Sequence, residues 1–200
     1  MPERAGAVSS LEEFWEGLAA RGVEPDLERT LRERAARTTG PEGRAGPPEL
    51  LEAVAERLVP GAVPASVLAA FLDEHFDRQL GRGDERVGVL PREELIPTGF
   101  AVLEDEARQR YHMAFSRLDV AQQEALLASA QRGEIEGPPG FDAAEWFGRV
   151  LDLLLLGYGS DPRGMVEMGF PGPSYEKGHV WLSEFEVVRR AERAPGYLEL

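Results

Sequence analysis

The stretch FDAAEWFGRVLDLLLL, residues 141–156, carries the clearest information about the fold of this chain. Its apolar side chains recur at helical spacing and cover much of the circumference of one helix. A helix with such a surface is buried against several neighbours rather than along a single face. The stretch therefore predicts a helix inside a bundle, with these apolar residues buried: Trp146, Phe147, Val150, Leu151, Leu153, Leu154 and Leu155.

Helical patterns also precede this stretch, and strand patterns are nearly absent. Apolar stripes at helical spacing cover residues 50–58, 67–80 and 100–115, and Asp119 with Gln122 resembles a capping box for a helix over residues 120–130. The segment between 81 and 99 shows no such stripe, which predicts an irregular connection. We expect an all-α fold, an irregular bundle of about five to seven helices with a long Gly/Pro-rich C-terminal loop.

The N-terminal part of the chain is predicted to form a helical extension. Ser10 and Glu13 match a capping box, and Pro25 occupies a favourable first-turn position for a second helix. The Gly- and Pro-rich stretch from Thr39 to Pro48 lacks apolar periodicity and leaves little to bury, so it predicts a flexible linker. We therefore expect an extension and linker over residues 1–48 and a main helical domain over residues 49–200.

Glycine and proline punctuate the stretch after the long helix, GYGSDPRGMVEMGFPGPSY, residues 157–175. Glycine permits positive φ and proline fixes φ, so the stretch predicts a pre-shaped loop rather than a regular element. Tyr158, Phe170 and Tyr175 fall in this loop. Aromatic side chains held in this way are good anchors for a partner surface.

The order of these motifs resembles the gluconate 2-dehydrogenase subunit 3 family. The resemblance rests on LLEAVAERLVPG (50–61), VLAAFLDEHFDRQL (67–80), FSRLDVAQQEALLASA (115–130) and, after the long helix, Ser160-Asp161-Pro162 and Gly169-Phe170-Pro171-Gly172. The chain departs from the commonest family pattern after Pro162. There, Arg163-Gly164-Met165-Val166 stands in place of a tyrosine and a Gly-Gly-Asn-type turn.

The resemblance implies a non-catalytic small subunit. Such a subunit binds and stabilises, and often helps to export, a flavin-dependent dehydrogenase of the glucose–methanol–choline class that oxidises sugars or sugar acids. It implies no cofactor in this chain, FAD in the large partner subunit and, in many complexes, a cytochrome c subunit as a further partner. The predicted partner interface comprises Tyr158, Ser160, Asp161, Pro162, Phe170, Pro171, Gly172 and Tyr175.

Family members often carry a twin-arginine export signal. The N-terminus MPERAGAVSSLEEFWEG shows no paired arginines followed by an apolar stretch. We therefore expect a cytoplasmic protein, or one exported only together with a signal-bearing partner.

The composition narrows the functional classes. The net charge of −14 disfavours nucleic acid and anionic membrane surfaces as partners, and the longest apolar run, residues 153–156, is too short for membrane insertion. The chain has no cysteine, which excludes disulfides, thiolate catalysis and a covalent c-type haem. A protein partner is thus favoured over a nucleic acid or an anionic membrane surface.

Candidate sites of other kinds are weak. Asp73 and Asp77 share a helix face and His75 points elsewhere, so a solvated face is favoured over a metal site. His112 and His179 lack a neighbouring serine or carboxylate at a telling spacing, which leaves an enzyme site built on them as a remote alternative. The main alternative to a subunit is a free-standing helical module that binds a peptide or an apolar small molecule.

Overall fold

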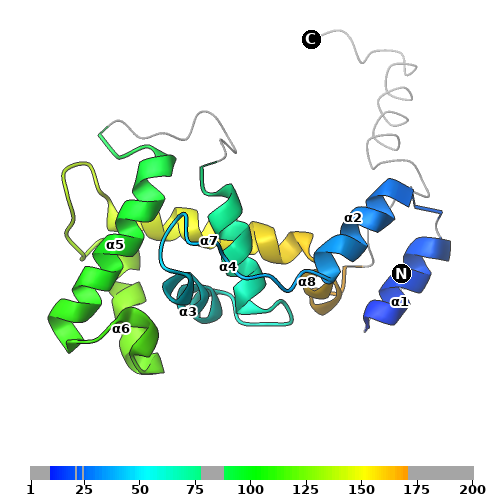
Figure 1. Ribbon diagram of the computed structural model, residues 1–200, viewed down its shortest axis with the longest axis horizontal. Coiled ribbons are helices and arrows are strands. Elements are labelled where there is room, and N and C mark those ends of the chain that lie inside the picture. The colour runs from blue at the N-terminus through cyan, green and yellow to red at the C-terminus, as the bar shows by residue number, and fades with distance from the viewer. Residues whose placement is uncertain (1–9, 21, 24, 78–87, 171–200) are drawn as a thin grey trace, which may run out of the picture.

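The computed structural model describes residues 10–20, 22–23, 25–77 and 88–170. Within these residues it contains eight α-helices, one 3₁₀ helix and no strand, which confirms the all-α class (Figure 1). The last helix, α8 (Pro162–Glu167), lies in a stretch predicted as loop. Among the described residues, no helix is both long and apolar enough to cross a membrane.

Helix α7 (Ala143–Ser160) is the axis of the fold. It contacts α3 (Pro48–Leu58), α4 (Ala65–His75), α5 (Arg92–Tyr111), α6 (Val120–Gln131) and α8, and Figure 1 shows it running behind α4 from the α5 end of the molecule to α8. Its buried residues include Trp146, Val150 and Leu154. Contact with five helices explains why its sequence is apolar around so much of its circumference.

Helix α5 begins within the segment predicted to be irregular. It starts at Arg92 and contains Pro97, although an internal proline removes one backbone hydrogen bond. Gly99 lies under the indole of Trp146, and a Cβ at Gly99 would come within 2.1 Å of Trp146 Cδ1. The indole Nε1 donates to the Ile96 carbonyl over 3.2 Å. The glycine therefore serves close packing of α5 on α7. The prediction of an irregular connection was wrong for residues 92–99, which are helical.

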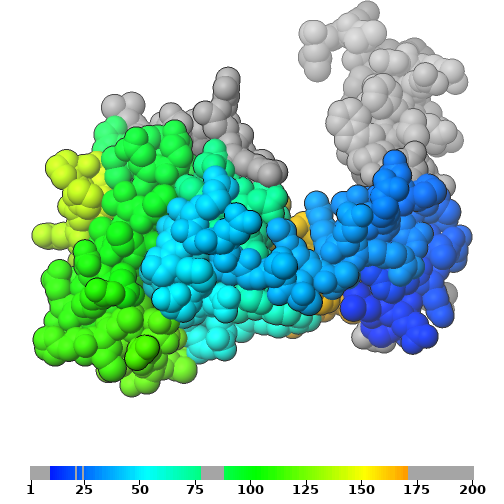
Figure 2. Space-filling view, in the orientation of Figure 1, coloured from blue at the N-terminus to red at the C-terminus, as the bar shows by residue number. Residues whose placement is uncertain are grey.

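Two helices, α1 (Leu11–Ala20) and α2 (Pro25–Ala35), lie where the capping box and Pro25 predict them. The N–H of Glu13 donates to Ser10 Oγ, as the capping pattern predicts. Both helices contact α8, and a small second core of Phe14, Leu18, Val23 and Leu31 packs against Met165 and Val166 of α8. In Figure 2 these helices form the blue lobe at the right of the molecule.

The buried carboxylate of Asp73 ties the segment between α2 and α3 to α4. Asp73 is 2% exposed, its Oδ2 accepts the N–H groups of Glu42 and Gly43 at 2.8 Å each, and its Oδ1 accepts the N–H of Ala45 at 2.6 Å. Ala45 is itself buried in the main core. Two expectations are corrected here: the segment does have something to bury, and Asp73 does not belong to a solvated face.

Candidate functional site

The signature Ser160-Asp161-Pro162 forms a joint between two helices, not a loop. Helix α7 continues through Gly157 and Tyr158 to Ser160, and α8 starts at Pro162 after a single residue, Asp161. The φ of Asp161 is −92° and its ψ is 133°, the extended conformation of an N-cap residue. Proline then occupies the first helical position, where its missing N–H costs nothing. The loop prediction for residues 157–167 was therefore wrong.

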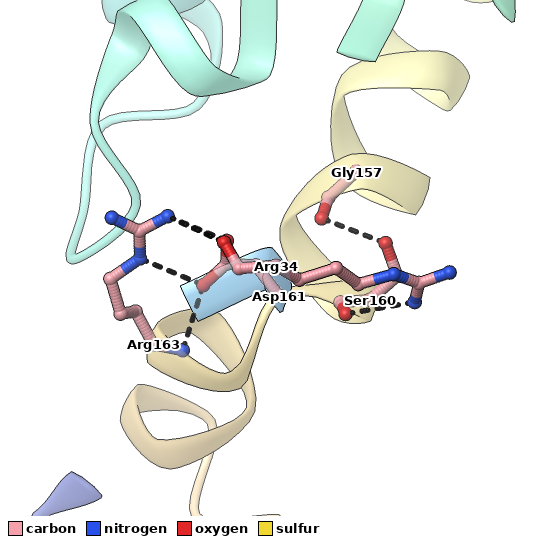
Figure 3. Close-up of polar contacts among 5 residues, drawn as sticks. All are labelled: Arg34, Gly157, Ser160, Asp161 and Arg163. Atoms are coloured by element: carbon pink, nitrogen blue, oxygen red, sulfur yellow. Dashed lines mark hydrogen bonds and ion pairs between the residues drawn. The ribbon is translucent and has the colours of Figure 1, made fainter. Parts of the chain in front are cut away.

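The Asp161 carboxylate holds the start of α8 in place. It accepts the backbone N–H of Arg163 at 2.9 Å, and the Arg163 guanidinium binds both carboxylate oxygens, with Nε at 2.9 Å and Nη2 at 2.7 Å (Figure 3). The Arg163 and Asp161 side chains are 16% and 6% exposed. Hydrogen bonding to Asp161 raises the pKa of Arg163 above its ordinary value. The Arg163 guanidinium therefore stays protonated in this contact.

The N-terminal extension reaches this joint through Arg34 at the end of α2. Its Nη1 donates to the Ser160 carbonyl over 3.2 Å, and Arg163 Nη2 lies 3.5 Å from the Arg34 carbonyl. Ser160 Oγ donates to the Gly157 carbonyl over 3.1 Å, which finishes the last turn of α7. As Figure 3 shows, Arg34 and Arg163 extend to opposite sides of Asp161. Two backbone carbonyls at the end of α7 are thus satisfied, that of Ser160 by Arg34 of α2 and that of Gly157 by the Ser160 side chain.

Two glycines at the joint are required by close packing. A Cβ at Gly157 would lie 2.9 Å from the Phe71 ring on α4, and one at Gly164 would lie 2.2 Å from the carbonyl oxygen of Tyr158. Neither glycine has positive φ. The glycines therefore let α4 and α8 approach α7 and do not shape a loop.

Tyr158 is a buried member of the main core, although it was predicted to be a loop aromatic outside any core element. Its hydroxyl donates to Glu167 Oε2 on α8, and the same oxygen accepts the N–H of Ala62 at 2.6 Å. Burial, followed by the bond to Glu167, raises the pKa of Tyr158. The bond from Tyr158, followed by that from Ala62, lowers the pKa of Glu167. The contact ties α8 to the α3–α4 connection.

The predicted interface residues thus separate into three groups. Tyr158, Asp161 and Pro162 are buried and Ser160 is half-buried, so they build the joint. Phe170 is 45% exposed. Pro171, Gly172 and Tyr175 lie outside the described residues, as does His179.

Some apolar side chains that were predicted to be buried, or for which no burial was predicted, are exposed. Leu155, predicted to be buried, is 51% exposed on α7, and Leu156 next to it is 49% exposed. Met168, just after α8, is 58% exposed. The sequence did indicate this exposure, because the apolar residues of α7 cover more of its circumference than the neighbouring helices bury.

The candidate metal and histidine sites have structural uses. Asp73 anchors the α2–α3 segment, Asp77 pairs with Arg44, and His75 stacks on Phe71 with ring centroids 4.2 Å apart. His112 ends α5 in the left-handed conformation, with φ 58°. It borders a groove of about 770 Å³ whose lining mixes charged residues, among them Glu104 and Arg108, with apolar ones such as Leu50 and Met113.

A smaller cleft of about 280 Å³ lies where α2, α4 and α7 meet, lined by residues that include Arg34, Phe71, His75 and Ser160. Ligand pockets are commonly ~300–1,000 Å³ and mostly apolar. The small cleft lies at the lower end of that range, and the lining of the large groove is only about half apolar rather than mostly so. Neither feature favours a small-molecule module.

The fold and the joint together define a class: an all-α protein whose family-signature residues are used to pack helices against one another. A sequence model described as gluconate 2-dehydrogenase subunit 3 matches residues 48–172, from the first residue of α3 to just beyond Phe170. Because the match covers more than half of the 200 residues, the chain belongs to the gluconate 2-dehydrogenase subunit 3 family. The family name points to an accessory subunit of a multi-subunit dehydrogenase. No curated protein and no solved structure shows a match to the chain.

Proposed function

We propose that this chain is the non-catalytic small subunit that binds and stabilises a FAD-dependent dehydrogenase of the glucose–methanol–choline class. The large partner carries FAD and oxidises a sugar or sugar acid, with a cytochrome c subunit as a further partner in complexes that have one. The observation that carries the proposal is the family match over residues 48–172. The chain works in the cytoplasm, or is exported together with a partner that carries the signal.

The local chemistry of the joint supports a packing role. Polar side chains at the joint are engaged within the chain: Asp161 binds Arg163, and Glu167 accepts from Tyr158 and from the Ala62 backbone. Catalytic acids and bases need access to a reacting atom and a pKa matched to their task. Glu167, whose pKa is lowered, and Arg163, whose pKa is raised, are both shifted away from proton exchange near neutral pH. These residues therefore favour a supporting role over a catalytic one.

Co-expression tests this function directly. The chain, carrying an affinity tag, is produced with the FAD-dependent dehydrogenase subunit encoded in the same genome, and the captured material is analysed by visible spectroscopy. We expect the complex to show flavin absorbance and the isolated chain to be colourless and inactive on sugars and sugar acids. Stoichiometric flavin in the isolated chain, or failure of the two chains to co-purify, contradicts the proposal.

A further inference from the structure

Exposed large apolar side chains gather on one part of the surface. Six described residues of this kind are more than a third exposed, and four of them lie on or beside α7 and α8. We call these four residues the apolar stripe: Leu155, Leu156, Met168 and Phe170. Contiguous exposed apolar surface on a globular protein commonly marks an interaction site.

The apolar stripe is continuous across the two helices. Leu155, Leu156 and Gly159 lie on one face of α7, because residues three and four apart are neighbours on a helix. Gly159 has no side chain to interrupt this face, and a Cβ there would touch the Met168 methyl carbon at 3.8 Å. Phe170 follows directly, its N–H bonded to the Met165 carbonyl over 2.8 Å. The stripe thus runs from α7 across Gly159 to the end of α8.

The joint described above holds this surface rigidly. Asp161 caps α8 and binds Arg163, and Tyr158 ties Glu167 to the body of the molecule. A surface that is already ordered loses less conformational entropy on association than a flexible segment does. The buried signature residues therefore have a consequence for binding, since they fix the relative positions of the exposed ones.

We infer that the apolar stripe is the surface that docks on the large flavoprotein subunit; the inference rests on the proposed function. The predicted interface is thereby moved from the buried Tyr158, Asp161 and Pro162 to the outward face of the same two helices. Phe170, which is exposed, belongs both to the interface predicted from the sequence and to the apolar stripe.

The charges beside the apolar stripe specify the partner's chemistry. Asp152 on α7 and Glu167 on α8 are exposed. The two arginines of these helices, Arg149 and Arg163, are each 16% exposed in the side chain and held in an ion pair. Arg34 of α2 is exposed too, and its guanidinium donates to the Ser160 carbonyl at the edge of the stripe. On α7 and α8 themselves the exposed charges are acidic, so the stripe has an acidic rim along these two helices and fits an apolar partner surface bordered by lysine or arginine.

The same charges disfavour two other occupants. A second copy would bring another chain of net charge −14 against the acidic rim. An anionic lipid surface repels the rim for the same reason. A distinct protein with a basic border is the occupant that the electrostatics favour.

Single-cysteine labelling tests the inference, because the natural chain contains no cysteine. Three full-length variants are made: Leu156→Cys and Met168→Cys in the stripe, and Met113→Cys, a 43% exposed position after α5, as the control. Each is labelled with a maleimide, alone and in complex with the FAD-dependent subunit used above. We expect all three thiols to react in the isolated chain, and the complex to slow labelling at 156 and 168 by about tenfold or more with no change at 113.

Charge substitution provides a second measurement. We expect Leu156→Glu to weaken the complex by about tenfold to hundredfold, as loss of an interface anchor does, and Met113→Glu to leave it unchanged. A wild-type complex with equal labelling at all three positions overturns the stripe as the docking surface and leaves the proposed function standing. Slow labelling at 156 in the isolated chain also overturns it, because another part of the chain or a second copy then covers the stripe. Absence of any wild-type complex overturns both proposals.

Discussion

Replacing Asp73 by alanine removes the carboxylate that ties the segment before α3 to α4. Three backbone N–H groups lose their acceptor: those of Glu42 and Gly43, at 2.8 Å, and that of Ala45, at 2.6 Å. Glu42 and Gly43 are exposed, so water can replace the lost acceptor there. Ala45 is only 2% exposed, and its N–H is left without a partner in the core.

The expected cost follows from this difference in burial. A hydrogen bond to a charged group contributes about 1.5–3 kcal/mol, and an unsatisfied buried donor costs about the same. With the full cost at Ala45 and a fraction of it at the two exposed groups, Asp73→Ala should lower the free energy of unfolding by about 3 kcal/mol. For a chain of this size that corresponds to a fall in Tm of roughly 6–12 °C.

Urea unfolding followed by far-UV circular dichroism measures this loss, with Asp77→Ala as the matched control. Asp77, one turn further along, makes an exposed ion pair with Arg44, and its removal should cost no more than about 1 kcal/mol. Limited trypsin digestion should also cut faster after Arg44 in Asp73→Ala than in the wild type. If the two aspartate variants lose equal stability, the anchoring role assigned to Asp73 is refuted.

Two further predictions concern the packing of α7. Gly99→Ala places a methyl group on the Trp146 indole and should lower the free energy of unfolding, measured in urea, by about 2–3 kcal/mol. Gly148→Ala has open space around its Cβ and should raise it by about 0.5–1 kcal/mol through helix propensity. Equal effects of the two substitutions would contradict the close-packing account. Tyr158→Phe should destabilise the chain at neutral pH, where Glu167 is ionised. Because the folded chain lowers the pKa of Glu167, the stability from this contact is present above the ordinary glutamate pKa and is lost as the pH falls through the lowered one, so the urea midpoints of wild type and variant should converge in acid. A difference that persists unchanged in acid would assign the effect to packing alone.

Much of the fold could be predicted from local patterns. The stripe of Leu50, Leu51 and Val54 predicts α3, and the Asp119–Gln122 pair predicts the start of α6, where both capping bonds are present. These signals act over a few residues, so one sequence is enough to read them.

The joint between α7 and α8 could not be read in this way. Glycine in such a stretch favours positive φ, but Gly157 and Gly164 serve close contact with Phe71 and with the Tyr158 carbonyl. Contacts of that kind depend on which helix lies opposite, which a local pattern does not reveal. Asp161-Pro162 is also a helix start signal, and the glycines around it obscured that alternative.

The long-range role of Asp73 was hidden for a related reason. Its partners lie about thirty residues earlier in the chain, so helical spacing alone places it on the same face as Asp77 and gives no reason to bury it. The exposure of Leu155 and Leu156 was missed because a helix apolar around much of its circumference is normally buried. The exception is informative, since it locates the apolar stripe.

The most direct test of the accessory role is the stability of the FAD-dependent subunit with and without this chain. The purified large subunit is held at a temperature near its own Tm, and release of FAD is followed by fluorescence in the absence and presence of an excess of the chain. A partner that binds only the folded state stabilises it by mass action. We therefore predict that FAD release slows as the chain is added, and that the slowing saturates at a fixed ratio of the chain to the large subunit. An unchanged rate of FAD release at every concentration of the chain would contradict the account.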